Sequence, residues 1–144
     1  MPATDAAVLL VEDDEALRRI LARHLRAAGY VVEEADSAEQ ATEALDRGLR
    51  PGLVILDVNL PGDNGWDLVR SPAMHRAGPP PVVIASAITV SPRRLAEFEI
   101  AGYLPKPFPL ETLLHIVERV IGSPTDPDTA RGTGSDEVQG RALL

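Results

Sequence analysis

The feature that most constrains this chain is a repeated alternation of short, mainly apolar runs with longer amphipathic segments. The runs occupy residues 7–11, 30–35, 53–56, 82–85 and 102–104. Such alternation is typical of parallel strands joined by crossover helices. Residues 53–56 are wholly apolar, as expected of a central strand buried on both faces, whereas Glu33 and Glu34 mark residues 30–35 as an edge strand. The sequence therefore predicts an α/β fold with a five-stranded parallel sheet.

The segments between the runs carry helix signals. Ser37 with Gln40 makes a capping box, and Ser91 with Pro92 gives a favourable first turn. Pro72 must end or restart the helix that begins near Gly65, because proline lacks the N–H that a helix interior needs. Helices are expected over residues 15–28, 37–47, from 65 onward, 91–100 and 109–121.

The length of 144 residues suits one domain, which we assign to residues 1–122. Residues 123–144 contain no aromatic residue and no apolar period, so we expect a flexible C-terminal tail. The 22 acidic and 14 basic residues give a net charge of −8, the wrong sign for binding nucleic acid or an anionic membrane directly. The chain has no cysteine, which excludes thiolate chemistry, and its apolar runs are too short to span a bilayer. A cytoplasmic location is the default expectation.

Polar side chains follow four of the predicted strands at the points where those strands end. These side chains are Glu12, Asp13, Asp57, Ser86 and Lys106, the only lysine in the chain. The carboxyl ends of parallel strands share one edge of a sheet, where ligands bind. Clustered carboxylates repel one another and need a cation, and an oxygen-only ligand set favours Mg²⁺ over Zn²⁺. A carboxylate beside Mg²⁺, a lysine and a hydroxyl suits phosphoryl transfer, and Asp57 is the best candidate nucleophile because it ends the most buried strand.

Four segments resemble the receiver domain of two-component response regulators in order and approximate spacing. They are VLLVEDDEALRRIL, LVILDVNLPGDNGWDL, PVVIASA and YLPKPF, and the resemblance covers about residues 7–121. It implies a doubly wound, flavodoxin-like (βα)5 fold with strand order 2-1-3-4-5. It also implies a cis peptide bond between Lys106 and Pro107.

The resemblance also implies roles for individual residues. Asp57 corresponds to the phosphoacceptor, Asp13 to a direct Mg²⁺ ligand, and Glu12 to an acidic residue acting through metal-bound water. Asn59 corresponds to the residue whose backbone carbonyl completes the metal shell. Ser86 and Lys106 match the hydroxyl and the lysine that contact the phosphoryl group, and Ser86 and Tyr103 match the pair that changes on activation.

Two departures from the family pattern stand out. Only 20 residues separate Ser86 from Lys106, so the fourth helix or its loops must be short, and the acidic pair often found before the aromatic residue is missing in IAGY. Ser71 and Pro72 interrupt the third helix. None of these departures touches the acidic site formed by Glu12, Asp13 and Asp57.

The leading functional hypothesis is a phosphoacceptor that receives its phosphoryl group from a histidine kinase or phosphotransfer protein and then binds a downstream protein. Such a protein is not an enzyme in the ordinary sense, because its chemistry is self-phosphorylation and slow self-hydrolysis. A monomer or weak homodimer is expected. One alternative is a phosphate-independent interaction module that keeps the same fold. Another is a haloacid-dehalogenase-like phosphatase, which Asn59 disfavours because that class needs a carboxylate at this position.

Overall fold

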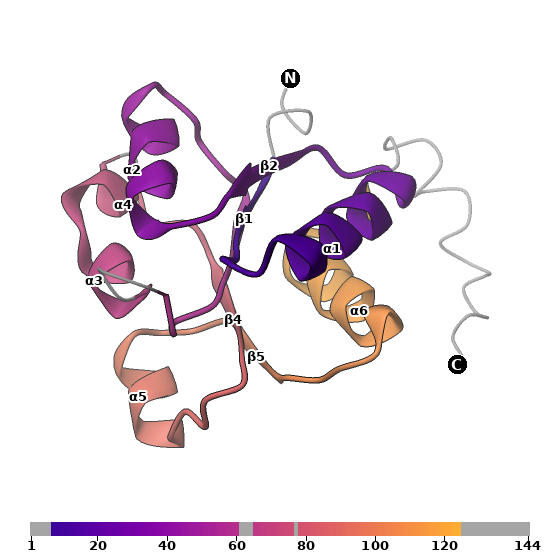
Figure 1. Ribbon diagram of the computed structural model, residues 1–144. Coiled ribbons are helices and arrows are strands. Elements are labelled where there is room, and N and C mark those ends of the chain that lie inside the picture. The colour runs from indigo at the N-terminus through magenta and orange to yellow at the C-terminus, as the bar shows by residue number, and fades with distance from the viewer. Residues whose placement is uncertain (1–6, 61–64, 77, 125–144) are drawn as a thin grey trace.

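The computed structural model describes residues 7–60, 65–76 and 78–124, which form a parallel sheet between two layers of helices (Figure 1). The strands are β1 Val8–Val11, β2 Val32–Ala35, β3 Leu53–Leu56, β4 Val82–Ser86 and β5 Gly102–Pro105. The helices are α1 Glu15–Ala27, α2 Ala38–Asp46, α3 Gly65–Arg70, α4 Pro72–His75, α5 Pro92–Glu97 and α6 Leu110–Ile121. The sheet order β2-β1-β3-β4-β5 confirms the predicted doubly wound topology. Residues 125–144 of the predicted tail lie outside the described residues.

Alternate side chains of the central strands enter two separate cores. Leu53 and Ile55 of β3 face the core shared with α1 and α6, whereas Val54 and Leu56 face the core shared with α2, α3 and α4. Figure 1 shows the same division, with α1 and α6 together on one side of the sheet and α2, α3 and α4 on the other. Full burial of each such side chain contributes roughly 1.5–3 kcal/mol, which explains why β3 contains only apolar residues.

The edge strand β2 is shorter than predicted, since it begins at Val32 instead of residue 30. The Tyr30 N–H donates to the Leu25 carbonyl, so Tyr30 still belongs to the turn that ends α1. Gly29 makes this turn with a φ of 104°, a conformation that glycine adopts readily. The Tyr30 ring is buried, and its hydroxyl donates to the Gly122 carbonyl at 2.8 Å. The apolar character of Tyr30 therefore reflects core packing and not strand pairing.

The predicted break in the third helix is confirmed. α3 ends at Arg70, and α4 begins with Pro72 in its first turn, where the missing N–H would have no helical partner. The hydroxyl of Ser71 accepts a hydrogen bond from the Met74 N–H and caps the new helix. Met74 is buried, so the short α4 is also anchored by packing.

α5 ends at Glu97, three residues before the predicted end at Ile100. Glu99 has a φ of 54°, which is outside the helical region, and the Ile100 N–H turns back to the Leu95 carbonyl. Smaller boundary corrections occur elsewhere: α1 and α2 each end one residue early, and α6 begins after Pro109. β4 and β5 each extend one residue further than predicted, because Ser86 pairs with Pro105. Across the described residues, no helix is both long and apolar enough to cross a membrane.

Candidate functional site

The parallel register brings the carboxyl ends of β1, β3, β4 and β5 to one edge of the sheet. Val11 lies opposite Leu56, so Glu12 and Asp57 follow neighbouring strands at the same level. Ser86 lies opposite Pro105 in the same way, and Lys106 follows directly. The backbone continues this alignment, since the Asp57 N–H donates to the Val11 carbonyl at 3.1 Å and the Lys106 N–H to the Ser86 carbonyl at 3.0 Å. The predicted convergence of these residues is therefore a result of strand pairing.

The Lys106 ammonium joins two buried carboxylates. Its Nζ lies 2.7 Å from Glu12 Oε1 and 2.9 Å from Asp57 Oδ2. The side chains of Glu12 and Asp57 are only 3% and 7% exposed, so water screens this arrangement weakly. The peptide bond that follows Lys106 is cis, as the resemblance implied.

Asp13 adds a third carboxylate to this group. One carboxylate oxygen each from Glu12, Asp13 and Asp57 lies within 4.8 Å of the others, which is close enough for all three to share a cation. Asp13 is exposed, so the cluster opens to solvent on one side. Three oxygen donors, two of them buried, fit a hard divalent ion such as Mg²⁺. The donor set therefore agrees with the cofactor that the sequence predicts.

Burial dominates the ionisation of this cluster. It raises the pKa of Glu12, although hydrogen bonds from Lys106 and the Asp14 N–H act in the opposite direction; the charge of Asp57 raises the pKa further. Burial lowers the pKa of Lys106, but hydrogen bonds to Glu12 and Asp57 outweigh it, and the net pKa is raised. The ammonium is therefore held in its charged form between the two carboxylates.

Asp57 is also held from the loop that follows it. Its Oδ1 accepts a hydrogen bond from the Asn59 N–H at 2.9 Å, while Oδ2 faces Lys106. Both carboxylate oxygens are thus oriented by neighbouring donors. The predicted use of the Asn59 carbonyl as a metal ligand stays a prediction.

Ser86 and Tyr103 meet at one residue of the loop between β4 and α5. The Ser86 hydroxyl accepts a hydrogen bond from the Ile88 N–H at 3.1 Å, and the Tyr103 hydroxyl donates to the Ile88 carbonyl at 3.2 Å. Tyr103 also accepts from the Val90 N–H at 3.3 Å. Ser86 is fully buried, and none of its hydrogen bonds among the described residues reaches Asp57. The two predicted switch residues are therefore linked through Ile88.

Gly65 supports the site, although its place in the sequence predicts only the start of a helix. A Cβ at this position would lie 2.6 Å from Val58 Cα and 3.0 Å from the Asp57 carbonyl oxygen. The Gly65 N–H also donates to the Val58 carbonyl. The start of α3 can approach the backbone of Asp57 only because residue 65 has no side chain.

Trp66 extends from this contact toward α5. Its ring packs on Phe98 with a centroid distance of 4.8 Å, and the Arg94 guanidinium lies 5.1 Å from the Trp66 ring centroid. Trp66 is half-buried, as expected of a packing residue at a helix start. Trp66 is thus next in sequence to Gly65, which contacts Val58, and its indole packs against Arg94 and Phe98 at α5.

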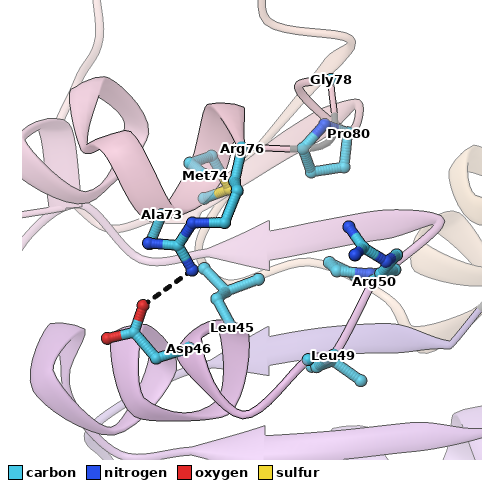
Figure 2. Close-up of a pocket in the computed structure, with 11 residues that line it drawn as sticks. Leu45, Asp46, Leu49, Arg50, Ala73, Met74, Arg76, Gly78 and Pro80 are labelled. Carbon is cyan, nitrogen blue, oxygen red and sulfur yellow. Dashed lines mark hydrogen bonds and ion pairs between the residues drawn. The ribbon is translucent and has the colours of Figure 1, made fainter.

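A separate cavity of about 230 Å³ lies at the other end of the strands, where β3 and β4 begin (Figure 2). Its lining includes Pro51 and Pro80, which precede β3 and β4, and an ion pair of 2.9 Å joins Arg76 to Asp46. Leu45 and Met74 supply buried apolar contacts. The described lining residues bring one carboxylate to the cavity and no carboxylate cluster, so the acidic edge is the stronger candidate for phosphoryl chemistry.

Comparison with known families agrees with this geometry. The profile of the response regulator receiver domain matches residues 8–118. DNA-binding transcriptional regulator NtrC of a Bradyrhizobium species is 34% identical over 127 residues, which are 88% of this chain and 26% of that protein. Response regulator MprA of Mycobacterium leprae is 37% identical over 125 residues, 85% of this chain and 54% of that protein. The chain thus spans about a quarter to a half of the length of these relatives.

Solved structures show the same relationship. The non-phosphorylated HemR receiver domain of Leptospira biflexa is 37% identical, with a TM-score of 0.71 over 84% of this chain and 97% of that one. A Vibrio cholerae chemotaxis protein of the CheY type is 31% identical, with a TM-score of 0.71 over 80% of this chain and 98% of that one. The fold is therefore shared with these proteins over most of the chain.

Proposed function

The chain belongs to the response regulator receiver domain family, and on that premise we propose that Asp57 accepts a phosphoryl group from a histidine kinase or phosphotransfer protein. Asp57 ends the central strand β3, is almost fully buried and has both carboxylate oxygens oriented by donors. Its neighbours Glu12 and Asp13 supply the acidic set that a cation needs.

The observation that carries this proposal is the position of Lys106. Its ammonium lies 2.9 Å from Asp57, where it can also meet an oxygen of a phosphoryl group attached to that side chain. Burying two carboxylates without a positively charged partner would be costly, and Lys106 is the partner that the fold places between them. Charge stabilisation at the acceptor thus comes from a group that is already in place.

In the proposed step, an Asp57 carboxylate oxygen uses an electron pair to form a bond to phosphorus. The P–N bond of a phosphohistidine breaks, and its electron pair stays on the imidazole nitrogen of the donor. Lys106 compensates negative charge on the phosphoryl oxygens. The Ser86 oxygen accepts from the Ile88 N–H, so its own O–H remains available to donate to one of them. Mg²⁺ held by Asp13, Asp57 and the Asn59 backbone carbonyl, with Glu12 acting through metal-bound water, would supply further positive charge to those oxygens.

The test is labelling with acetyl phosphate. We expect the parent to gain the mass of one phosphoryl group in the presence of Mg²⁺ and none after chelation. Asp57→Asn should not be labelled, while the control Asp14→Asn should be labelled normally, because Asp14 serves as the α1 N-cap and asparagine caps equally well. Labelling of Asp57→Asn at the parental level would refute the assignment of Asp57.

A phosphate-independent interaction module is the second candidate, and the six-residue α5 is the observation that favours it. A short α5 changes the surface beside Tyr103 without touching the acidic cluster. In that case the parent and the Asp57→Asn variant would bind the partner equally well, with or without a phosphodonor. Partner binding that is identical before and after phosphorylation would favour this alternative.

The proposed output is binding to a downstream protein through the region around Ile88. Ser86 holds the Ile88 N–H and Tyr103 holds its carbonyl, so movement of Ser86 toward a phosphoryl group would disturb both contacts. Ile88 is 46% exposed, so a partner can reach it. The same proposal places the domain in the cytoplasm as a monomer or weak homodimer. It includes no direct contact with nucleic acid and no catalytic turnover of a substrate.

The output proposal is tested with a beryllofluoride mimic of the phosphoryl group. In the parent, we expect the mimic to shift the NMR signals of Ile88 and of the Tyr103 ring. In Ser86→Ala, the mimic should still bind at Asp57 but produce much smaller shifts at Tyr103. Unchanged signals at both residues in the mimic-bound parent would mean that the signal leaves by another face.

A further inference from the structure

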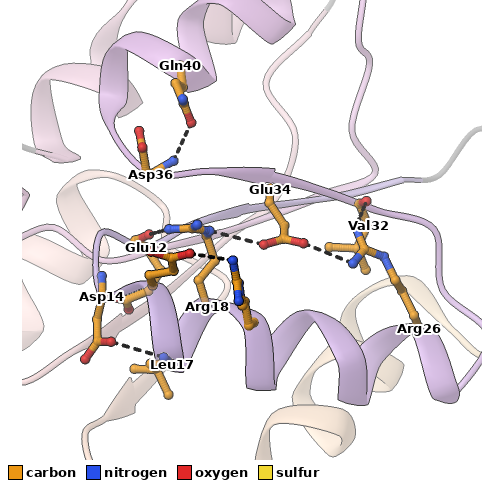
Figure 3. A network of polar contacts seen from close by, with 11 residues as sticks. Glu12, Asp14, Leu17, Arg18, Arg26, Val32, Glu34, Asp36 and Gln40 are labelled. Atoms are coloured by element: carbon orange, nitrogen blue, oxygen red, sulfur yellow. Dashed lines mark hydrogen bonds and ion pairs between the residues drawn. The ribbon is translucent and has the colours of Figure 1, made fainter.

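Arg18 of α1 connects the edge strand to the backbone of the acidic cluster (Figure 3). Its Nη1 donates to the Glu12 carbonyl at 3.0 Å, and its Nε donates to Glu34 Oε1 at 3.1 Å. The Arg18 side chain is only 14% exposed, so its contacts are partly buried and less screened by water than those of a fully exposed ion pair. The guanidinium thus spans from β2 to the residue that follows β1.

The Glu12 carbonyl needs a donor at this point because the sheet no longer supplies one. The Glu12 N–H still pairs with the Ala35 carbonyl of β2, but the chain beyond Ala35 turns away toward α2. Among the described residues, no backbone N–H donates to the Glu12 carbonyl. Arg18 therefore takes the place of the next hydrogen bond of the parallel ladder.

Glu34 fixes the guanidinium in this position. Glu34 Oε1 accepts a hydrogen bond from Arg18, and Glu34 Oε2 accepts one from Arg26 at 3.0 Å. Arg26 also donates to the Val32 carbonyl at 2.8 Å. The two arginines thus make the same pair of contacts, a Glu34 oxygen and a backbone carbonyl, but only Arg18 reaches the acidic cluster (Figure 3).

The direction of the Glu12 peptide affects the cation site directly. Glu12 Oε2 accepts a hydrogen bond from the Asp14 N–H at 3.0 Å, so the turn from Glu12 to Asp14 is closed on itself. Arg18 holds the carbonyl at the start of this turn, and Lys106 holds the other carboxylate oxygen of Glu12. A change in the peptide direction would therefore move the carboxylates of both Glu12 and Asp13 relative to Asp57.

We propose that Arg18 is a positioning residue of the cation site, which orients the Glu12–Asp14 turn so that its carboxylates face Asp57. This inference rests on the proposed function, since it assigns Mg²⁺ to that site. Within the part of the chain that the structure describes, Arg18 contacts no carboxylate of the cluster and acts only through the Glu12 backbone.

Arg18→Lys is the test variant and Arg26→Lys is its matched control. Lysine keeps the charge and the aliphatic stem, but one ammonium cannot reproduce the planar fork that reaches both Glu34 and a carbonyl. We expect Arg18→Lys to weaken Mg²⁺ binding, measured by calorimetry, roughly 10- to 100-fold, the usual effect of losing an outer contact to a metal ligand. Arg26→Lys should bind Mg²⁺ like the parent, although it loses the same kind of contact with Glu34.

A second measurement separates positioning from stability and from the proposed function. The NMR signal of the Asp14 N–H, which reports its bond to Glu12, should shift in metal-free Arg18→Lys and stay in place in Arg26→Lys. Equal effects of the two variants on Mg²⁺ binding and on the Asp14 signal would overturn the inference, as would parental behaviour of Arg18→Lys. If the parent itself bound no Mg²⁺, the proposed function would fail, and the Asp14 signal alone would still decide the role of Arg18.

Discussion

Lys106 shows how much a single side chain contributes to this edge of the sheet. It is the only lysine in the chain, and its ammonium lies between Glu12 and Asp57. Without it, two buried carboxylates would face each other with Asp13 beside them. Removing one partner of a buried charge group is strongly destabilising because the remaining charges lose their compensation.

We predict that Lys106→Met lowers the free energy of unfolding by about 3 kcal/mol in the absence of Mg²⁺, measured by urea denaturation at neutral pH. Adding Asp57→Asn to this variant should recover much of the loss, since it removes one of the two repelling charges. The single variant Asp57→Asn serves as the control and should change stability less. A Lys106→Met protein as stable as the parent would show that the ion pairs contribute little.

The residues of the cluster could be predicted because each one follows an apolar strand within two residues, and strand ends meet at one edge. The contributions of Arg18 and Gly65 to the site could not be predicted from the sequence in this way. The contact of Arg18 with the Glu12 carbonyl depends on where β2 ends, and the close approach of Gly65 depends on how the start of α3 packs against Asp57 and Val58. Both are consequences of tertiary geometry, and neither residue type marks such a role by itself.

Among the elements, α5 departs most from its predicted length. Its last turn is closed by Glu99 at a φ of 54°, a conformation that glycine adopts without strain and other residues do not. Ser91 and Pro92 predict the start of the helix correctly, and Ser91 accepts from the Arg94 N–H as a cap should. No glycine or proline marks its end in the sequence, so the periodic pattern alone predicts a helix that is too long. The strand order followed from the resemblance to receiver domains, whereas polarity indicated only that β2 is an edge strand.

We predict that Glu99→Gly raises the free energy of unfolding by about 1 kcal/mol, because it removes the strain of a left-handed non-glycine residue. The control Glu97→Gly, at the last helical residue of α5, should instead lower stability by up to roughly 1 kcal/mol, because glycine is less favourable than glutamate at a helical position. Thermal and urea unfolding measure both effects. Opposite signs for the two variants are required; a loss of stability in Glu99→Gly would contradict the assigned strain.

On the scale of the whole molecule, one hydrogen bond ties the beginning of the fold to its end. The Tyr30 hydroxyl, after α1, donates to the carbonyl of Gly122, after α6. Burial, and to a lesser degree the charge of Glu118, raises the pKa of Tyr30 to about 12. The folded protein therefore keeps the phenol protonated at a pH where the unfolded chain releases the proton.

This difference predicts a loss of stability in alkali. The unfolded phenol titrates near its ordinary pKa of 10.0, so stability contributed by Tyr30 is complete below that pH and falls as pH rises toward 12. The loss by pH 12 is on the order of 2 kcal/mol. Tyr30→Phe should be less stable than the parent at neutral pH but show a shallower decline between pH 10 and 12 in urea denaturation. Parallel pH profiles for the two proteins would rule out this linkage.

The double contact of Lys106 also has a consequence for how the acidic edge responds to ions. The ammonium is a counter-ion that the chain carries with it, at an effective concentration fixed by the fold and not by the medium. Under the proposed function, a divalent ion would share Glu12 and Asp57 with this resident charge. Its apparent affinity would then be lower than that of three carboxylates without a lysine, so metal occupancy would follow the free Mg²⁺ concentration.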